Sequence, residues 1–241
     1  MKQTILVVNP NCLQAVTDGM SAALEGFRFP QGPQIRCETL KSGPPGIETQ
    51  AHVDGITPKL LEWFEHKPER KRADAVVVAC FSDPAVTALR EVLAAPVIGI
   101  GEASYLSAAA LGERFGVIAI LSRSIPRHRR AQRALGLEHK VAGELPLELK
   151  VAELENEQIV WKRLNLLGNK LRDEHGANAV ILGCAGMARY RTRLEDALGV
   201  PVVDPTQAAV GMALCLLLAK RDALPLANSD ALMLEARNQA Y

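Results

Sequence analysis

Short runs of hydrophobic residues alternate along this chain with longer stretches whose hydrophobic positions recur every three to four residues. The short runs, together with an alternating run at 34–40, predict strands at 4–8, 34–40, 75–79, 96–100, 114–121, 140–145, 179–183 and 201–203. The longer stretches predict helices at 13–24, 52–66, 84–93, 103–111, 125–135, 151–175, 187–198 and 205–219. Short, continuous apolar strands that alternate with helices are typical of parallel sheets covered by helices on both faces. The pattern therefore predicts an α/β fold.

One stretch of this pattern occurs twice. The segments ADAVVVACFSDP at 73–84 and ANAVILGCAGMA at 177–188 each end an apolar run on a cysteine. A predicted helix follows each segment, and then a short strand opened by proline. Cys80 and Cys184 are 104 positions apart, and the two prolines are 105 apart. The matched spacings predict a duplicated unit with a thiol at the same place in each half.

The duplication predicts the domain organisation. We expect two similar subdomains at 1–112 and 113–220, each a roughly four-stranded parallel sheet flanked by helices. A polar tail follows at 221–241. The helix at 205–219 could pack back on the first subdomain. The active site is expected in the cleft between the two subdomains.

Several polar or reactive residues stand at the carboxyl ends of predicted strands, namely Asn9, Asn11, Cys80, Ser122 and Cys184. Ligands of parallel α/β sheets bind outside these strand ends. A cysteine at a strand end that leads into a helix lies near backbone N–H groups and the positive end of the helix dipole. Both lower the pKa of a thiol from its free value of about 8.5.

Small residues follow each cysteine and let a substrate approach the backbone closely; they are Ser82, Ala185 and Gly186. The N–H groups there could hold a carboxylate or a carbonyl oxygen. We therefore place these three residues, with Asn9, Asn11 and Ser122, in the predicted substrate-binding site.

Two thiols that face each other across one cleft suit the inversion of a carbon next to a carbonyl. One thiol, as thiolate, removes a proton from that carbon, and the other delivers a proton to the opposite face. Negative charge builds on the carbonyl oxygen, and the amide and hydroxyl donors of the site could stabilise it. This chemistry requires no cofactor and no metal.

The composition of the chain argues against several classes of binding partner. The formal net charge is +1 and aromatic residues make up 4% of the chain, which argues against nucleic acid. The longest apolar run, at 208–219, is shorter than the roughly 20 residues that cross a bilayer, so no membrane partner is expected. The odd number of cysteines, five, has no zinc-type or disulfide-type spacing. With no signal-peptide pattern at the N-terminus, we expect a cytoplasmic protein with a small-molecule substrate.

The other reactive or charged side chains are predicted to be structural. The five histidines and the charged runs at 69–72 and 127–133 are expected on solvated helix faces. The remaining cysteines are expected in the core: Cys12, Cys37 and Cys215, the last on a buried helix face.

Two other functional classes remain open. A bilobed α/β chain is also a common design for small-molecule binding proteins without catalysis. A nucleophilic cysteine hydrolase would need a histidine base, and no histidine is an obvious partner of either cysteine.

Four segments of the sequence resemble the aspartate/glutamate/hydantoin racemase superfamily, and most closely its hydantoin and allantoin racemase branch. These are NPN at 9–11, ACFSDP at 79–84, RFGVIAILSR at 114–123 and GCAGM at 183–187. The resemblance implies a cofactor-independent racemase, usually a homo-oligomer. It further implies Cys80 and Cys184 as the acid/base pair, with Asn9 binding the substrate beside Asn11, Ser82, Ser122 and Gly186.

Two segments depart from the pattern of that branch. They are GPPGIE at 43–48 and DPT at 204–206, and both are expected to border the pocket. The superfamily also contains Asp/Glu racemases, arylmalonate decarboxylases and maleate isomerases, which are the alternatives. The decarboxylase pattern uses only one cysteine of the pair, so the presence of both favours racemisation.

Overall fold

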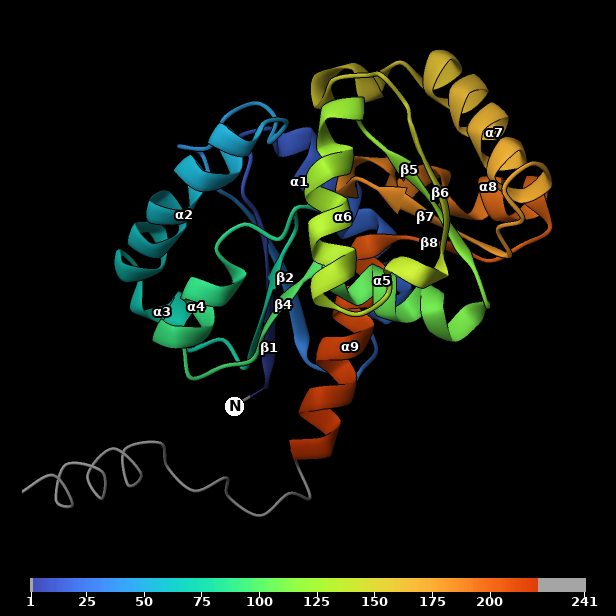
Figure 1. Ribbon diagram of the computed structural model, residues 1–241. Coiled ribbons are helices and arrows are strands. Elements are labelled where there is room, and N and C mark those ends of the chain that lie inside the picture. The colour runs from blue at the N-terminus through green and yellow to red at the C-terminus, as the bar shows by residue number, and fades with distance from the viewer. Residues whose placement is uncertain (1, 221–241) are drawn as a thin grey trace, which may run out of the picture.

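The computed structural model of the protein describes residues 2–220 and contains two parallel sheets of four strands each (Figure 1). The first sheet has the order β2-β1-β3-β4 and comprises β1 (Thr4–Asn9), β2 (Gln34–Thr39), β3 (Ala75–Val78) and β4 (Val97–Gly99). The second has the order β6-β5-β7-β8 and comprises β5 (Phe115–Ala119), β6 (Val141–Pro146), β7 (Ala179–Gly183) and β8 (Val202–Val203). The predicted fold, with two similar α/β halves, is confirmed. The strands that precede the two cysteines, β3 and β7, occupy equivalent places in the two sheets.

Helices cover both faces of each sheet. The α-helices are α1 (Gln14–Ala23), α2 (Gln50–Glu65), α3 (Pro68–Lys71), α4 (Val86–Val92), α5 (Ile100–Leu111), α6 (Ile125–Ala134), α7 (Glu157–Asp173), α8 (Arg191–Leu198) and α9 (Pro205–Lys220). Single 3₁₀ turns are η1 (Glu25–Phe27), η2 (Ser122–Ser124), η3 (Glu138–Lys140), η4 (Val151–Glu155) and η5 (Ala185–Tyr190).

The side chains of β1 point alternately to the two faces of the first sheet and pack into a core on each face. Ile5 and Val7 pack into the core formed with α1 and α9, whereas Leu6 and Val8 pack on the opposite face, into the core formed with α2 and α4. All four side chains are buried. Each contributes about 1.5–3 kcal/mol by burial, so the continuous apolar run stabilises both layers at once.

The last helix of each half covers the sheet of the other half. Tyr105 and Ala108 of α5, in the first half of the sequence, pack against the second sheet. Ala209 and Val210 of α9, near the end of the described chain, pack against the first sheet. The two helices also contact each other between the sheets (Figure 1). The helix at 205–219 therefore does pack back on the first half.

The helix predicted at 84–93 begins later than expected. Asp83 and Ala85 have positive φ angles of 47° and 62°, so the chain turns sharply after Cys80. The first helical residue of α4 is Val86, which places Pro84 before the helix rather than in its first turn. Cys80 consequently lies in a loop and not at the N-terminus of a helix.

Two further predicted helices are each divided in the structure. The stretch predicted at 151–175 is a 3₁₀ turn, η4, followed by α7, because the Asn156 side chain caps the new helix by accepting a hydrogen bond from the Ile159 N–H. Gly168, predicted as a weak point, lies buried inside α7. The stretch at 187–198 likewise contains η5 before α8 begins at Arg191.

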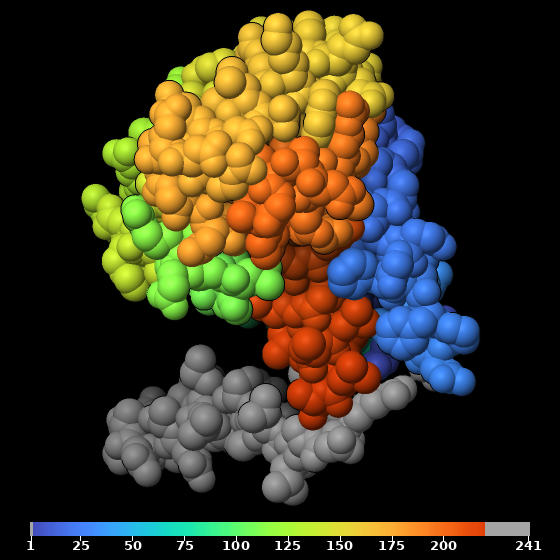
Figure 2. All heavy atoms as spheres, turned by 90° about the vertical axis from the view of Figure 1, so that its right-hand side faces the viewer, coloured from blue at the N-terminus to red at the C-terminus, as the bar shows by residue number. Residues whose placement is uncertain are grey.

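Two predictions about surface and core were wrong. Cys215 is exposed, because Ala213 and Leu217 form the buried face of α9 in this region and Cys215 lies off that face. Figure 2 shows the last turns of α9, in red, at the surface of the molecule. Arg70, in the charged run at 69–72, is buried: its guanidinium stacks 3.4 Å from the centre of the Trp63 ring and pairs with Glu38. Cys12 and Cys37 are half-buried.

The predicted tail at 221–241 lies outside the described residues, and the subdomain boundary between 112 and 113 stays a prediction. Within residues 2–220, none of the helices has the length and apolar character needed to cross a bilayer.

Candidate active site

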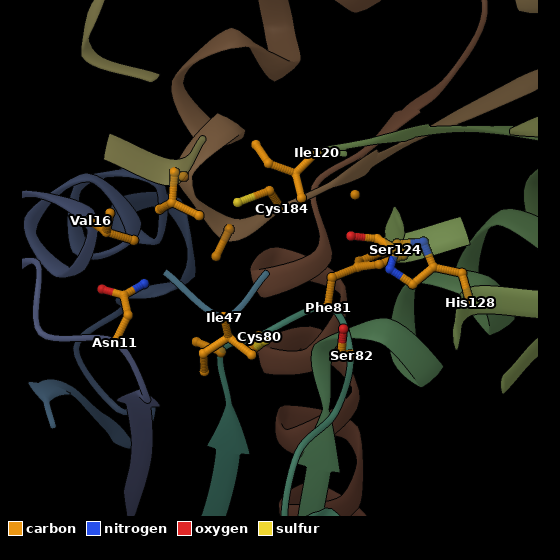
Figure 3. A pocket seen from close by; sticks show the side chains of 15 residues that line it. Asn11, Val16, Ile47, Cys80, Phe81, Ser82, Ile120, Ser124, His128 and Cys184 are labelled. Carbon is orange, nitrogen blue, oxygen red and sulfur yellow. The ribbon is translucent and has the colours of Figure 1, made fainter. Parts of the chain in front are cut away.

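A small cavity lies between the two halves, at the carboxyl ends of the central strands (Figure 3). Its volume is about 30 Å³. From the first half it is lined by Asn11, Ile47, Cys80, Phe81 and Ser82, among others, and from the second by Ile120, Ser124, His128, Val151, Cys184 and Gly186. Both predicted cysteines therefore face one cavity, as their matching places in the two sheets require.

Each thiol accepts a backbone hydrogen bond from the residue two positions later, Ser82 for Cys80 and Gly186 for Cys184. Burial nevertheless raises the pKa of Cys80 to about 12 and the pKa of Cys184 to about 11. The predicted lowering of these pKa values was wrong. Cys80 has no helix N-terminus beside it, and at both thiols the loss of water outweighs the N–H groups.

The two asparagines of the NPN turn make different contacts. Asn9 is fully buried, and its amide nitrogen donates to Asn11 Oδ1, the Leu13 carbonyl and Thr17 Oγ1. Asn11 accepts a second hydrogen bond at Oδ1, from the Leu13 N–H at 2.9 Å. Figure 3 shows the amide nitrogen of Asn11 pointing toward the cavity. Asn9 thus supports the turn, and Asn11 presents a donor to the site.

Of the two predicted serines, only one lines the cavity. Ser82 lines the cavity, but Ser122 is exposed in η2 and its N–H donates to Glu148. Two residues further on, Ser124 is buried and lines the cavity in its place. Arg127 donates to the hydroxyl oxygen of Ser124 at 3.2 Å, and so fixes a hydroxyl that the sequence prediction missed.

The GPPGIE segment closes the cavity from the first half. Ile47 contributes an apolar wall, and the Glu48 side chain reaches the second half. One carboxylate oxygen accepts from the Val151 N–H at 3.3 Å, and the other pairs with Arg123 at 3.2 Å. The expectation that this segment borders the pocket is confirmed. Asp204, in the second atypical segment, is buried but does not line the cavity.

His128 is the functional candidate that sequence reasoning missed, because it was predicted to lie on a solvated helix face. It is 2% exposed, lines the cavity and hydrogen-bonds through Nδ1 to Glu144. A signal was present: His128, Ala131, Gln132 and Leu135 follow helical spacing and form the inner face of α6. Within residues 2–220, no cluster of His, Cys, Asp or Glu is arranged to hold a metal ion.

Comparison with known proteins identifies the family. The family model described as Asp/Glu/Hydantoin racemase matches residues 5–213. The chain belongs to this family. The hydantoin racemase of Rhizobium meliloti is 35% identical over 216 residues, which cover 88% of this chain and 88% of that protein. The hydantoin racemase of Paenarthrobacter aurescens is 32% identical over 210 residues, which cover 87% of this chain and 89% of that protein.

A solved structure agrees with this assignment. The allantoin racemase from Klebsiella pneumoniae superposes with a TM-score of 0.85 at 30% sequence identity, over 91% of this chain and 89% of that chain. The Asp/Glu/hydantoin racemase family member described here is therefore an isomerase, a racemase, and not a binding protein without catalysis. The resemblance to the hydantoin racemase branch is confirmed, whereas the roles of the individual site residues stay predictions.

Proposed function

We propose that this racemase inverts the stereocentre of a 5-substituted hydantoin or an allantoin-like cyclic ureide, with Cys80 and Cys184 as its acid/base pair. The observation that carries the proposal is that two thiols, from equivalent strand ends of the two halves, line one small cavity. A flat ring held between them would present one face of its stereocentre to each sulfur.

The reaction moves only protons. The thiolate on one side takes the proton from the carbon and becomes a thiol, and the electron pair moves onto the neighbouring carbonyl oxygen. The thiol on the other side then donates its proton to the opposite face and becomes the thiolate. The Ser82 and Gly186 N–H groups stabilise whichever sulfur carries the charge. Asn11 and the hydroxyl groups of the site can donate to the developing oxyanion.

The chemistry of the lining favours a neutral ring over an amino acid. No lysine or arginine is among the described residues that line the cavity, and Arg127 behind it already donates to the Ser82 and Ser124 hydroxyls and to the Arg123 and Glu48 carbonyls. A free aspartate or glutamate, or a dicarboxylate such as maleate, would bring one or two carboxylates that need cationic partners. Amide, hydroxyl and imidazole groups instead suit the N–H and C=O groups of a cyclic ureide.

The test is incubation of single enantiomers of 5-substituted hydantoins, allantoin, aspartate and glutamate in D₂O, beside an enzyme-free control. Loss of optical rotation with deuterium at the stereocentre of a hydantoin or allantoin is expected. Activity confined to the amino acids, or none on the panel, would refute the proposed substrate.

Replacement of either thiol tests the mechanism. Cys80→Ser and Cys184→Ser should each lower racemisation by at least about 100-fold, the lower range for general acid–base catalysis. One variant can still exchange the proton of one enantiomer without inverting it. Cys215→Ser, at an exposed cysteine, is the control and should stay active. Full activity of either active-site variant contradicts the two-thiol mechanism.

The resemblance also supports a homo-oligomer, and the free cysteines support a cytoplasmic location, so we include both in the proposal. Sedimentation of the purified chain would measure the oligomeric state, and fractionation of the source cells the location.

A further inference from the structure

His128 is a buried histidine whose ring reaches the cavity from α6. It lines the cavity together with Cys80, Phe81 and Ser124, and Figure 3 shows the ring lying beside Ser124. Nδ1 is bonded to a carboxylate oxygen of Glu144. Among the residues that the structure describes, this is the one hydrogen bond of the ring, so the other ring nitrogen, Nε2, is left available at the cavity. A buried ring with one nitrogen held by protein and the other left free is suited to bind a ligand.

Glu144 is held as firmly as the histidine. Its side chain, on β6, is 3% exposed, and its second oxygen accepts from Gln132 Nε2 at 3.3 Å. The surroundings are apolar, with the Phe81 ring edge-on to the imidazole at 4.9 Å between centres. A buried histidine–carboxylate pair in such a place adds little stability compared with well-packed apolar residues. Packing alone therefore does not account for the pair.

The carboxylate determines what Nε2 can do. An acceptor at Nδ1 orients the ring and places the hydrogen on Nδ1, so that the neutral ring offers Nε2 as an acceptor. The amide nitrogen of Asn11 is a donor, and the hydroxyl groups of Ser82 and Ser124, whose oxygens already accept from Arg127, have their hydrogens left to donate. A ring that carries both C=O and N–H groups needs donors for its carbonyl oxygens and an acceptor for its N–H group. His128 Nε2 can supply that acceptor.

We infer that His128 Nε2 accepts a hydrogen bond from a ring N–H of the cyclic ureide, with Glu144 as the residue that positions it. This inference rests on the proposed function and narrows its substrate class to rings with a free N–H. His128 lines the cavity beside Cys80 and Ser124, so a ring held between the two thiols has Nε2 within its reach. The histidine would then fix which face of the ring meets Cys80.

The test measures binding of hydantoin itself, which has no stereocentre, and of its 1-methyl and 3-methyl derivatives by calorimetry. The unaltered protein should bind hydantoin about 10- to 100-fold more tightly than one of the two methyl derivatives, since that derivative leaves Nε2 unpaired and crowds it. In His128→Ala, the space vacated by the imidazole admits the methyl group, and the ratio should fall toward one. Equal binding of all three by the unaltered protein, or a ratio that persists in His128→Ala, overturns the inference.

A second variant separates binding from a merely structural role. Glu144→Gln can donate to Nδ1, which moves the hydrogen to Nε2 and turns the acceptor into a donor; hydantoin affinity should fall about tenfold or more. Glu138→Gln is the matched control, because the same change is made at an exposed carboxylate that pairs with Arg133 and does not line the cavity. Hydantoin should also shift the ¹⁵N resonance of His128 Nε2, and no shift on saturation contradicts the contact.

These outcomes are separate from those of the proposed function. Failure to racemise any hydantoin refutes the proposed function, while the binding ratio still decides the role of His128. No detectable binding of hydantoin overturns the inference about His128, while the racemisation panel still decides the proposed function. Racemisation of hydantoins with an unchanged methyl ratio in His128→Ala overturns only the inference about His128.

Discussion

Glu48 connects the two halves directly over the cavity, so its removal should loosen closure. The cavity holds about 30 Å³, and a site needs roughly 10–15 Å³ for one water, so the seven heavy atoms of a hydantoin ring require it to open and enlarge. The Glu48 side chain is 13% exposed and bonds to Arg123 and to the Val151 N–H. Both contacts join one half to the other, so they would be broken if the halves moved apart.

The two contacts differ in strength. The pair with Arg123 involves a half-exposed arginine, and such pairs contribute about 0.2–1 kcal/mol. The hydrogen bond to the Val151 N–H is charge-assisted, and its loss costs about 1.5–3 kcal/mol. Glu48→Gln keeps an acceptor for Val151 and removes the charge, so it should weaken hydantoin binding by up to about fivefold. Glu48→Ala loses both contacts and should weaken it by about 20- to 800-fold.

Calorimetry with hydantoin measures these affinities, and thermal unfolding checks that each variant is folded. Glu138→Gln is the control, because the pair of Glu138 with Arg133 is exposed and lies within the second half alone. Unchanged affinity in Glu48→Ala, or an equal loss in Glu138→Gln, would refute the idea that Glu48 holds the cavity closed.

Three other measurements follow from the geometry. Gly186→Ala should lower racemisation, because the added Cβ would lie 2.8 Å from Leu154 Cδ1 beside the site, whereas Gly19→Ala has open space and should not. Burial raises the pKa of Asp204 to about 6, above its unfolded value near 4, so its contribution to stability is present at pH 4 and lost as the pH rises through 6. Asp204→Asn should therefore raise the free energy of unfolding at pH 8, by at most about 3 kcal/mol, and not at pH 4; urea titrations at both pH values decide this. The raised pKa values of the two active-site thiols predict slow alkylation by iodoacetamide at pH 7 that rises about tenfold per pH unit, and a plateau below pH 9 would contradict them.

The layers of the fold could be predicted because they depend on local patterns. Continuous apolar runs such as 75–79 and 179–183 are buried on both faces, and parallel order brings their carboxyl ends to one edge. The equal spacing of Cys80 and Cys184 was enough to place them together. Neither conclusion required knowledge of the surrounding side chains.

The electrostatics of the site could not be predicted in the same way. The thiols are shielded from much of the solvent because Ile47 and Val151, from segments far away in the sequence, line the same cavity. Burial of this kind depends on the assembled fold and reverses the sign of the expected pKa shift. The inward face of α6, by contrast, could be predicted from the helical spacing of His128 and Gln132. The arginines that surround them in the run at 127–133 instead favoured the prediction of a solvated helix face.

The exchange of α5 and α9 between the sheets has a consequence for how the chain is made. A nascent chain that ends at residue 112 already contains all four strands of the first sheet, yet the side chains of β1 and β3 that await α9 are still uncovered. The same fragment carries α5, whose residues Tyr105 and Ala108 pack on strands that have not yet been synthesised. The first half therefore cannot complete its core before translation reaches the last helix, so its full stability should be acquired late in synthesis.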